Sequence, residues 1–552
     1  MKRGESRVEK TVETFQNFVN PFDADKERFL FVSSGISASP EVEKDILRAE
    51  EVGLEAKETF IKDRLQKEIR FFDPIKKLKL KTFGDMKKRV KLKTSSNKEV
   101  QYIQQGNIAF QLLVKSQKLL GDKLELAELM SYQLTPVPYS LALADGLMSK
   151  TDNSKGMHHL VTDTDDATVT PYPNEILVIE DGNAVFHRLH DLPDKFSGIA
   201  RKVLEESVLK SSSVKAMERN RRGVGDKLIV SGGEMKRPKD WKVFLSNDDN
   251  KVQLVKVLPD TWSSALKTPI LHDSEVVLVC EGSAYMLRST GDAMSCVEIE
   301  SLQSDQEETD TRVVLYCLYA QEMLYSTARV KTPDTDIFFI LLHHARRFTD
   351  LRVLFETGKG RTKCCIDISK LAESYSPVFR AALLGLYAFS GCDSTSAFRS
   401  KGKVKALKFL EKHEKFHAAF AELGESWTVA EVVVASLEEF TCLLYGDKRV
   451  TKVNTLRHTR LLKKCGEDGK LKPSKKIDLA SLPPCQSSLV EHINRVNFQV
   501  GIWKRAHIPK PDIPDPTKGH GWTVDDGKIQ PKWTGKNVLP TELVDILVDL
   551  LN

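Results

Sequence analysis

This 552-residue chain lacks the features that assign many proteins to a class at sight. Its nine cysteines include no C-x-x-C pair, and Cys364 and Cys365 are adjacent, which suits neither a disulfide framework nor a zinc finger. Apolar runs fall short of the roughly 18 residues that a membrane helix needs, and the charged segment after Met1 is not a secretory signal. We therefore expect reduced thiols in an intracellular, nuclear protein that does not enter a membrane.

Several catalytic motifs are missing as well. Gly358-Lys359 resembles part of a phosphate-binding loop, but Val353 stands where the first glycine of that motif belongs. The histidine pairs at 158–159 and 343–344 lack the H-E-x-x-H frame of a metalloprotease, and no G-x-S-x-G elbow is present. These absences argue against a P-loop nucleotidase, a zinc protease and a serine hydrolase.

The composition is that of a soluble globular protein, with 41% hydrophobic and 29% charged residues. The net charge of +6 permits nucleic-acid binding without requiring it. Residues 76–93 are densely basic, which is typical of a nuclear import signal, of a phosphate-contacting surface, or of a simply solvated segment.

Short apolar runs alternate with helical patterns from residue 175 onward, which predicts an α/β fold with a central, mostly parallel sheet flanked by helices. The pattern predicts strands over residues 175–179, 275–280, 336–342, 351–355 and 364–368, with a lesser one at 285–288. We expect three regions: a mainly helical N-terminal region (1–165), the α/β domain (166–410, with a helix–loop–helix at 391–410), and a mainly helical C-terminal region (411–552, Pro/Gly-rich at 509–540).

Acidic residues stand at the ends of these elements. The candidates are Asp181 after the first strand, Glu308 and Asp310 at the start of a helix, Asp334 and Asp336 at the third apolar run, and Asp393 in a Gly-Cys-Asp turn. In a parallel sheet the carboxyl ends of the strands meet at one edge, so these side chains are expected to converge. Carboxylates suit Mg²⁺ or Mn²⁺, and a pair of such ions catalyses phosphodiester hydrolysis. Taken singly, each acid is equally well explained as a helix cap or turn residue.

In their order, these motifs resemble those of the flap-endonuclease-like branch of the PIN-like nucleases, over residues 175–410. The resemblance implies that all six acids bind two metal ions and that the partner is nucleic acid, DNA before RNA. It also implies that Lys215 and Arg222 stabilise phosphate charge, that a basic helix carries Lys215, Arg219, Arg221 and Arg222, and that Lys401, Gly402 and Lys403 hold the nucleic-acid backbone. The whole chain, including residues 104–110 and 502–505, resembles a group of proteins abundant in corals, other invertebrates and fish, for which we infer a mobile-element origin.

The chain departs from this family's pattern at two points. The family has a second strand ending in Asp before the basic helix, and residues 204–215 contain neither. Ser400 stands where the helix–loop–helix normally has Gly, at a position where a positive φ would cost a serine energy. These departures leave a second hypothesis open, a PIN-like binding module for nucleic acid or protein that does not cleave.

Overall fold

The structure is a computed structural model, and it describes residues 29–31, 36–38, 40–65, 80–82, 126–143, 146–161, 176–180, 186, 189, 191–207, 227–265, 275–280, 282–289, 294–306, 308–358, 363–463, 479–525 and 528–540. Asp181, the basic segment from Lys215 to Arg222 and residues 541–552 of the expected C-terminal region lie outside these residues.

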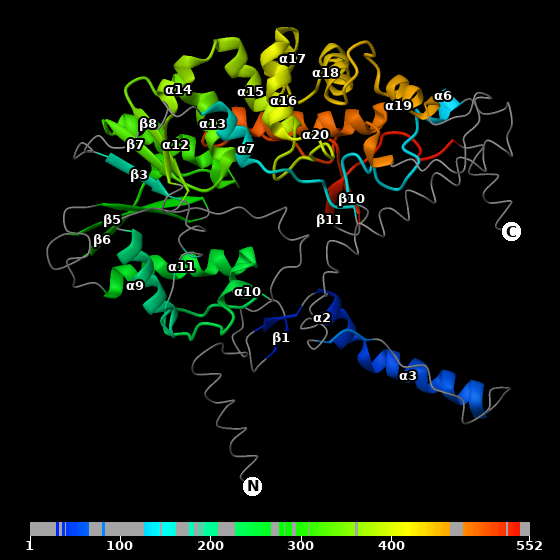
Figure 1. The fold of residues 1–552 in the computed structure, drawn as a ribbon. Coiled ribbons are helices and arrows are strands. Elements are labelled where there is room, and N and C mark those ends of the chain that lie inside the picture. Colours follow the sequence, from blue (N-terminus) through cyan, green and yellow to red (C-terminus); the bar gives the residue numbers. More distant parts are fainter. Residues whose placement is uncertain are drawn as a thin grey trace. The chain divides into compact units, whose positions relative to one another are not determined.

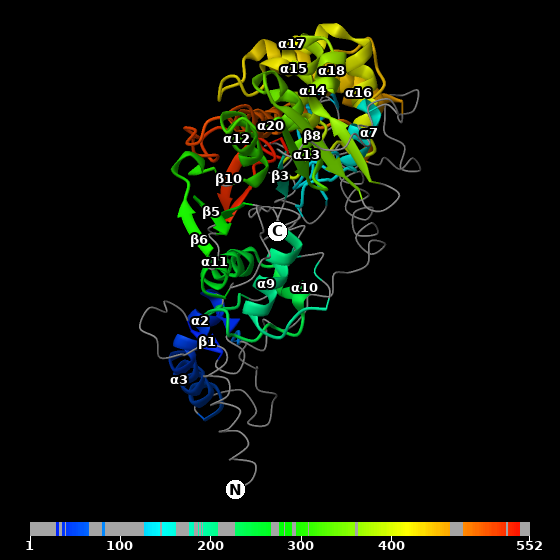
Figure 2. The same cartoon turned by 90° about the vertical axis from the view of Figure 1, so that its left-hand side faces the viewer.

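The chain forms two compact units (Figures 1 and 2). One unit comprises residues 1–92 and 182–299, and the other comprises residues 93–181 and 300–552. This division differs from the boundaries expected at residues 165 and 410, because residues 182–299 interrupt the unit that holds the parallel strands. We call this second unit the acidic-site unit, since it contains the described acids of the sequence motifs.

The sheet of the acidic-site unit has four strands in the order β3-β7-β8-β9. β3 (Ile176–Glu180), β7 (Thr327–Lys331) and β8 (Arg352–Thr357) are parallel, and β9 (Cys364–Asp367) pairs with β8 in the antiparallel sense. A mixed α/β fold with a mostly parallel sheet is therefore confirmed. The strands expected at 175–179, 351–355 and 364–368 are β3, β8 and β9.

The strand expected at 336–342 is wrong: these residues belong to a helix, α13 (Thr335–His344). Its side chains are buried around nearly the whole circumference, from Ile337 to Leu342 without a break. A short apolar run cannot distinguish a buried strand from a buried helix by its periodicity. The feature that marks the helix is Asp334, which caps it by accepting a hydrogen bond from the backbone N–H of Asp336.

The strand next to this helix, β7, was not expected from the sequence. Its polar residues alternate with buried Ala328 and Val330, so it contains no continuous apolar run. Arg329 on its polar face forms an ion pair with Glu356 of the neighbouring strand β8, and both side chains are largely buried. One face of β7 is therefore apolar and buried, and the other is held to β8 by a buried ion pair.

Helices surround this sheet and extend away from it. They are α6 (Leu126–Leu129), α7 (Ser154–Leu160), α12 (Thr309–Glu322), α14 (Ile368–Ser374), α15 (Pro377–Phe389), α16 (Lys403–Lys412), α17 (His417–Glu422), α18 (Glu431–Leu444), α19 (Val453–Leu462) and α20 (Gln486–Lys504). A hairpin of β10 (Trp522–Asp525) and β11 (Lys528–Pro531) follows. In both views α15, α17 and α18 lie together above α20 (Figures 1 and 2).

The long helix α20 is buried along most of its length, polar residues included. The His492 ring packs against the rings of Phe389 and Phe398, and its Nε2 pairs with the backbone oxygen of Phe389 at 3.0 Å. At the other end of the helix, the Trp503 carbonyl pairs with Nε2 of His344 in α13 at 2.9 Å. Helix α20 thus contacts the C-terminal ends of both α15 and α13.

The other unit has its own three-stranded antiparallel sheet, β4 (Val276–Cys280), β5 (Ser283–Ser289) and β6 (Met294–Glu298). Its core is formed with α9 (Phe196–Ser207), α10 (Trp241–Leu245) and α11 (Asp248–Ala265) around stacked Trp241 and Phe244. Residues 241–265 thus form two helices, separated at Ser246 and Asn247. The unit also contains β1 (Leu30–Phe31), β2 (Ile36–Ser37), α2 (Pro40–Leu47) and α3 (Ala49–Phe60). No described helix of either unit is both long and apolar enough to cross a bilayer.

Burial of histidines in the acidic-site unit predicts a stability that depends on pH. Burial lowers the pKa of His344 and of His492 to about 3, and that of His343 to about 4, from 6.5. The unfolded chain then binds protons that the folded chain does not, so stability falls as the pH drops below 6.5, by up to about 1.4 kcal/mol per pH unit for each histidine. Urea unfolding at several pH values measures the free energy of unfolding as a function of pH. Below pH 6.5 this free energy should fall less steeply with pH in His492→Phe than in the unmodified chain, and an equally steep fall would contradict this assignment.

Candidate metal centre

The candidate centre begins where β7 ends. After Lys331 the chain passes through Thr332 and Pro333 to Asp334, whose N–H donates to the Thr332 hydroxyl at 3.1 Å. The Oδ1 atom of Asp334 accepts the Asp336 N–H at 2.9 Å, and α13 starts there. Asp334 and Asp336 are therefore fixed at the N-terminus of a helix, where the helix dipole favours negative charge.

The third acid, Asp310, lies in the first turn of α12. The segment before this helix is held by Arg312, which donates to the carbonyl oxygens of Gln306 at 2.6 Å and of Ser304 at 3.3 Å. Thr311 adds a hydrogen bond from its hydroxyl to the Glu308 carbonyl at 2.8 Å. Side-chain hydrogen bonds thus fix the backbone at the start of α12, as they do at the start of α13.

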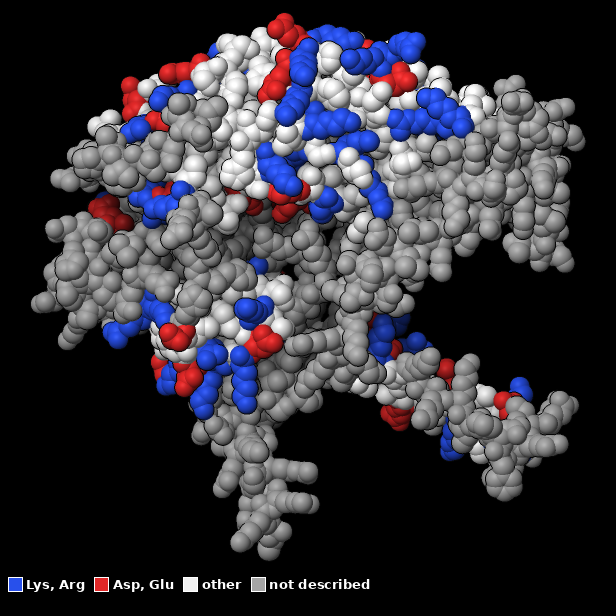
Figure 3. Space-filling model, in the orientation of Figure 1, with Lys and Arg blue, Asp and Glu red and all other residues white. Residues whose placement is uncertain are grey.

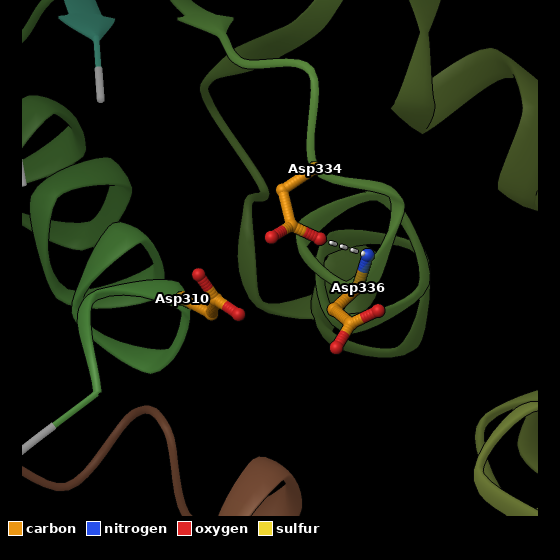
Figure 4. Close-up of side chains that lie close together, drawn as sticks. All are labelled: Asp310, Asp334 and Asp336. Carbon is orange, nitrogen blue, oxygen red and sulfur yellow. Dashed lines mark hydrogen bonds between the residues drawn. The ribbon is translucent and has the colours of Figure 1, made fainter. Parts of the chain in front are cut away.

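These two helix starts bring three carboxylates together. One carboxylate oxygen from each of Asp310, Asp334 and Asp336 lies within 4.8 Å of the others (Figure 4). Asp310 and Asp336 are 2% and 3% exposed, and Asp334 is half-buried. Buried charges of one sign at this range are costly unless something opposes them. A divalent cation would, and hard carboxylate oxygens suit Mg²⁺, Mn²⁺ or Ca²⁺, so this acidic triad could hold a metal ion.

A tyrosine completes the surroundings of the triad. The Tyr387 hydroxyl of α15 donates to Oδ1 of Asp336 at 2.5 Å and lies 3.1 Å from the Thr335 hydroxyl. Burial and the neighbouring Asp336 charge raise the pKa of Tyr387 well above its usual value. The phenol therefore remains protonated and is a permanent donor to this carboxylate.

Two of the predicted ligands are not part of this triad. Glu308 is the cap residue of α12, and its Oε2 accepts from Gln499 of α20 at 3.4 Å. Asp393 lies in the loop after α15, where its carbonyl oxygen and that of Cys392 accept from Lys150. Within the described ranges, the triad is the single group of three or more such side chains that could share a cation. Asp181 is outside those ranges, although β3, the strand before it, ends in register with Lys331.

One of the three residues expected to hold the nucleic-acid backbone, Lys401, Gly402 and Lys403, is buried. Lys403 was predicted to contact a nucleic-acid backbone, but it is 2% exposed. Its Nζ donates to the Tyr387 carbonyl at 2.8 Å, contacts the Gly391 carbonyl, and lies 3.6 Å from the centre of the Tyr387 ring. Burial lowers its pKa to about 7, against the attraction of Cys392, Asp336 and Asp393. Lys403 therefore caps the end of α15, and the expected contact of its side chain with a nucleic-acid backbone is wrong.

The remaining loop residues keep an accessible position. Lys401 is partly exposed, and Gly402 is the exposed residue before α16. Ser400 has a φ of 58°, the left-handed geometry expected for a residue in the place of a glycine. Gly391 has a φ of 106°, and a Cβ there would lie 2.7 Å from Ala397. Ser400 therefore has the positive φ expected at this position, but the helix–loop–helix expected at 391–410 is wrong, because residues 391–402 contain no helix and only α16 follows them.

Tyr387 and Gln499 are the polar neighbours that reasoning from sequence missed. Both lie on helices far along the chain from the acids they contact, by 51 and 191 residues. In the sequence each belongs to an ordinary buried helical pattern. Nothing in the neighbouring residues predicts that Tyr387 contacts Asp336 or that Gln499 contacts Glu308.

Asp334→Asn tests whether the triad binds a cation. Asparagine is also a good helix cap, so the substitution removes charge while keeping an acceptor for the Asp336 N–H. We expect Mn²⁺ at 100 times its Kd to stabilise the unmodified chain by about 2.7 kcal/mol, and the variant by much less. Calorimetry with and without Mn²⁺ measures this, with Asp240→Asn at the cap of α10 as the matched control. Equal Mn²⁺ stabilisation of all three proteins would place the cation elsewhere.

No family model, curated protein or solved structure matched the chain. The resemblance to the flap-endonuclease-like nucleases therefore depends on the order of the acidic motifs.

Proposed function

We propose that the chain is a divalent-metal-dependent phosphodiesterase that acts on nucleic acid, related to the PIN-like nucleases of the flap-endonuclease type. The observation that carries the proposal is the convergence of Asp310, Asp334 and Asp336 on one buried point. The three acids belong to two motifs for which the family resemblance implies metal binding, and they are 24 and two residues apart (334 − 310 and 336 − 334).

The chemistry of the donor set fits the proposed cation. When bound among carboxylates, Mg²⁺ or Mn²⁺ can lower the pKa of a coordinated water and polarise a phosphoryl oxygen. The protein's own contribution is to hold the acids still. Asp334 is fixed by backbone hydrogen bonds and Asp336 by Tyr387, so little reorganisation accompanies binding.

A basic surface supports nucleic acid as the partner. Residues 394–410 contain five Lys or Arg and no Asp or Glu, and residues 448–463 contain six and none. The two segments meet at Tyr445, whose ring lies 4.7 Å from Lys401 Nζ and 5.6 Å from the Arg460 guanidinium. Lys405 donates to the Leu444 carbonyl at 2.9 Å. We call Lys401, Lys405 and Arg460 the basic surface. Figure 3 shows lysines and arginines gathered over α16 and α19.

The charges of the basic surface repel one another. Burial lowers the pKa of Lys401, and the neighbouring charges of Lys405 and Arg460 lower it further. Arg460 donates to the carbonyl oxygens of Ser481 and Tyr445, and Lys405 also donates to a carbonyl. Among the described residues, backbone dipoles rather than carboxylates therefore face Lys405 and Arg460. A phosphate backbone would relieve this repulsion and release its own counterions.

The alternative, a binding module that does not cleave, has one observation in its favour. Glu308 and Asp393, two of the expected ligands, lie outside the described triad. Three carboxylates suit one cation better than the pair of cations that two-metal hydrolysis uses. In this alternative the cation stabilises the start of α13, and the basic surface binds nucleic acid without reaction.

A cleavage assay separates the two functions. With Mg²⁺ or Mn²⁺, the chain should cut flapped, branched or single-stranded DNA, or the matching RNA, and Asp310→Asn or Asp336→Asn should reduce the rate at least about 100-fold. Asp240→Asn should cleave at the unmodified rate. Binding without cleavage on every substrate would select the binding module instead.

The basic surface makes a separate prediction about affinity. In EDTA, the double variant Lys401→Gln/Lys405→Gln should bind a DNA duplex more weakly, with a salt slope smaller by about two, one for each phosphate that a lysine no longer neutralises. The control is Lys415→Gln/Lys518→Gln, which removes the same charge from lysines already paired with Glu439 and Asp515. Equal salt slopes for both double variants would place the nucleic acid on another surface.

A further inference from the structure

The segment between α20 and the β10–β11 hairpin is rich in proline. Over residues 508–516 the sequence is IPKPDIPDP, in which four residues are prolines and four others directly precede one. A proline fixes its own φ at about −65°, and it disfavours the helical region for the residue before it. Among these residues, Asp512 alone escapes both restrictions. The sequence therefore favours an extended, polyproline-type conformation over this segment.

The structure agrees with this conformation from Pro511 to Asp515, which belong to no helix, strand or turn. Burial follows a period of three here, because Pro511 and Pro514 are half-buried whereas Asp512, Ile513 and Asp515 are exposed. In a polyproline helix every third residue lies on the same face. The segment therefore has one face against the protein and presents the other two faces to solvent.

Both ends of this segment are held by hydrogen bonds. Before it, the Gln306 side chain donates to the Ile508 carbonyl at 2.5 Å, and the Ser304 hydroxyl donates to the Pro509 carbonyl at 2.8 Å. After it, the Asp515 carboxylate accepts the Thr517 N–H at 2.9 Å. Between these ends, residues 510–514 make neither a hydrogen bond nor an ion pair with any residue that the structure describes. The segment is thus extended before any partner binds, which lowers the entropy cost of binding.

We propose that residues 510–515 are a docking segment for a protein partner that binds extended, proline-rich chains in a groove lined with aromatic side chains. A P-x-x-P repeat places two prolines, each with the residue before it, one turn apart, which is the form that such grooves recognise. Lys510-Pro511 and Ile513-Pro514 form this repeat, about 9 Å apart at about 3.1 Å per residue. The inference goes beyond the proposed phosphodiesterase function and does not depend on it.

The charges of the segment indicate the kind of groove. Ile513 is 38% exposed and stands in the sequence between Asp512 and the proline that precedes Asp515, so an apolar side chain is flanked by two acids. Lys518 lies 3.9 Å from the Asp515 carboxylate, whereas Asp512 has no ion pair with a described residue. Basic side chains at the rim of an aromatic groove would complement these acids. The same acids repel phosphate groups, which favours a protein over nucleic acid as the partner of this segment.

Ile513→Ala/Pro514→Ala tests the inference on the full chain. Titration calorimetry against a set of purified SH3, WW and EVH1 domains measures binding, since these classes recognise proline-rich segments. At least one domain should bind the unmodified chain, and the double variant should bind that domain at least about 10-fold more weakly, because the groove loses an apolar side chain and a proline ring. Asp512→Lys should also weaken binding, and more so at low salt than at high salt.

Ile508→Ala/Pro509→Ala is the matched control. It removes an isoleucine that is 37% exposed and the proline after it, but from the bend that precedes the extended run. This variant should bind as tightly as the unmodified chain, and equal weakening by both double variants would contradict recognition of the P-x-x-P repeat. Absence of binding by every domain of the set would overturn the inference. Neither result bears on the cation site, which calorimetry of Asp334→Asn with Mn²⁺ tests separately.

Discussion

The mutual repulsion of Asp310, Asp334 and Asp336 is the constraint around which this part of the chain is arranged. Carboxylates buried at this range persist because each lies at a helix start, where backbone N–H groups and the helix dipole oppose the negative charge. Tyr387 adds a hydroxyl donor, and the buried Lys403 adds a positive charge behind the tyrosine ring.

Sequence order predicted that Asp310, Asp334 and Asp336 meet, although it placed Asp334 on the wrong element. Asp334 was expected to enter a strand, which would put it at the amino end of that strand, and it caps helix α13 instead. Because α13 follows β7, Asp334 lies just after the carboxyl end of a parallel strand, which is the edge where ligands of such a sheet are expected. The order of the motifs therefore identified three acids that meet, but the expected strand would have placed Asp334 at the opposite edge.

Lys403 and Tyr387 show what could not be predicted. A lysine in a Ser-Lys-Gly-Lys loop is expected at the surface, and its burial follows from the carbonyls at the end of α15 and the ring that it covers. The Tyr387 contact with Asp336 spans 51 residues and two helices, so it depends on how α13 and α15 pack. The insertion of residues 182–299 between β3 and α12 left no composition signal either.

The central claim is that the triad is a cation site, and anomalous scattering tests it most directly. In a crystal of the full chain grown with Mn²⁺, a difference map collected at the manganese edge should show a peak bounded by Asp310, Asp334 and Asp336. The same crystals would show whether a second ion lies beside the first. Saturating Mn²⁺ with no peak there, or a side chain of the triad turned away to solvent, would contradict the account.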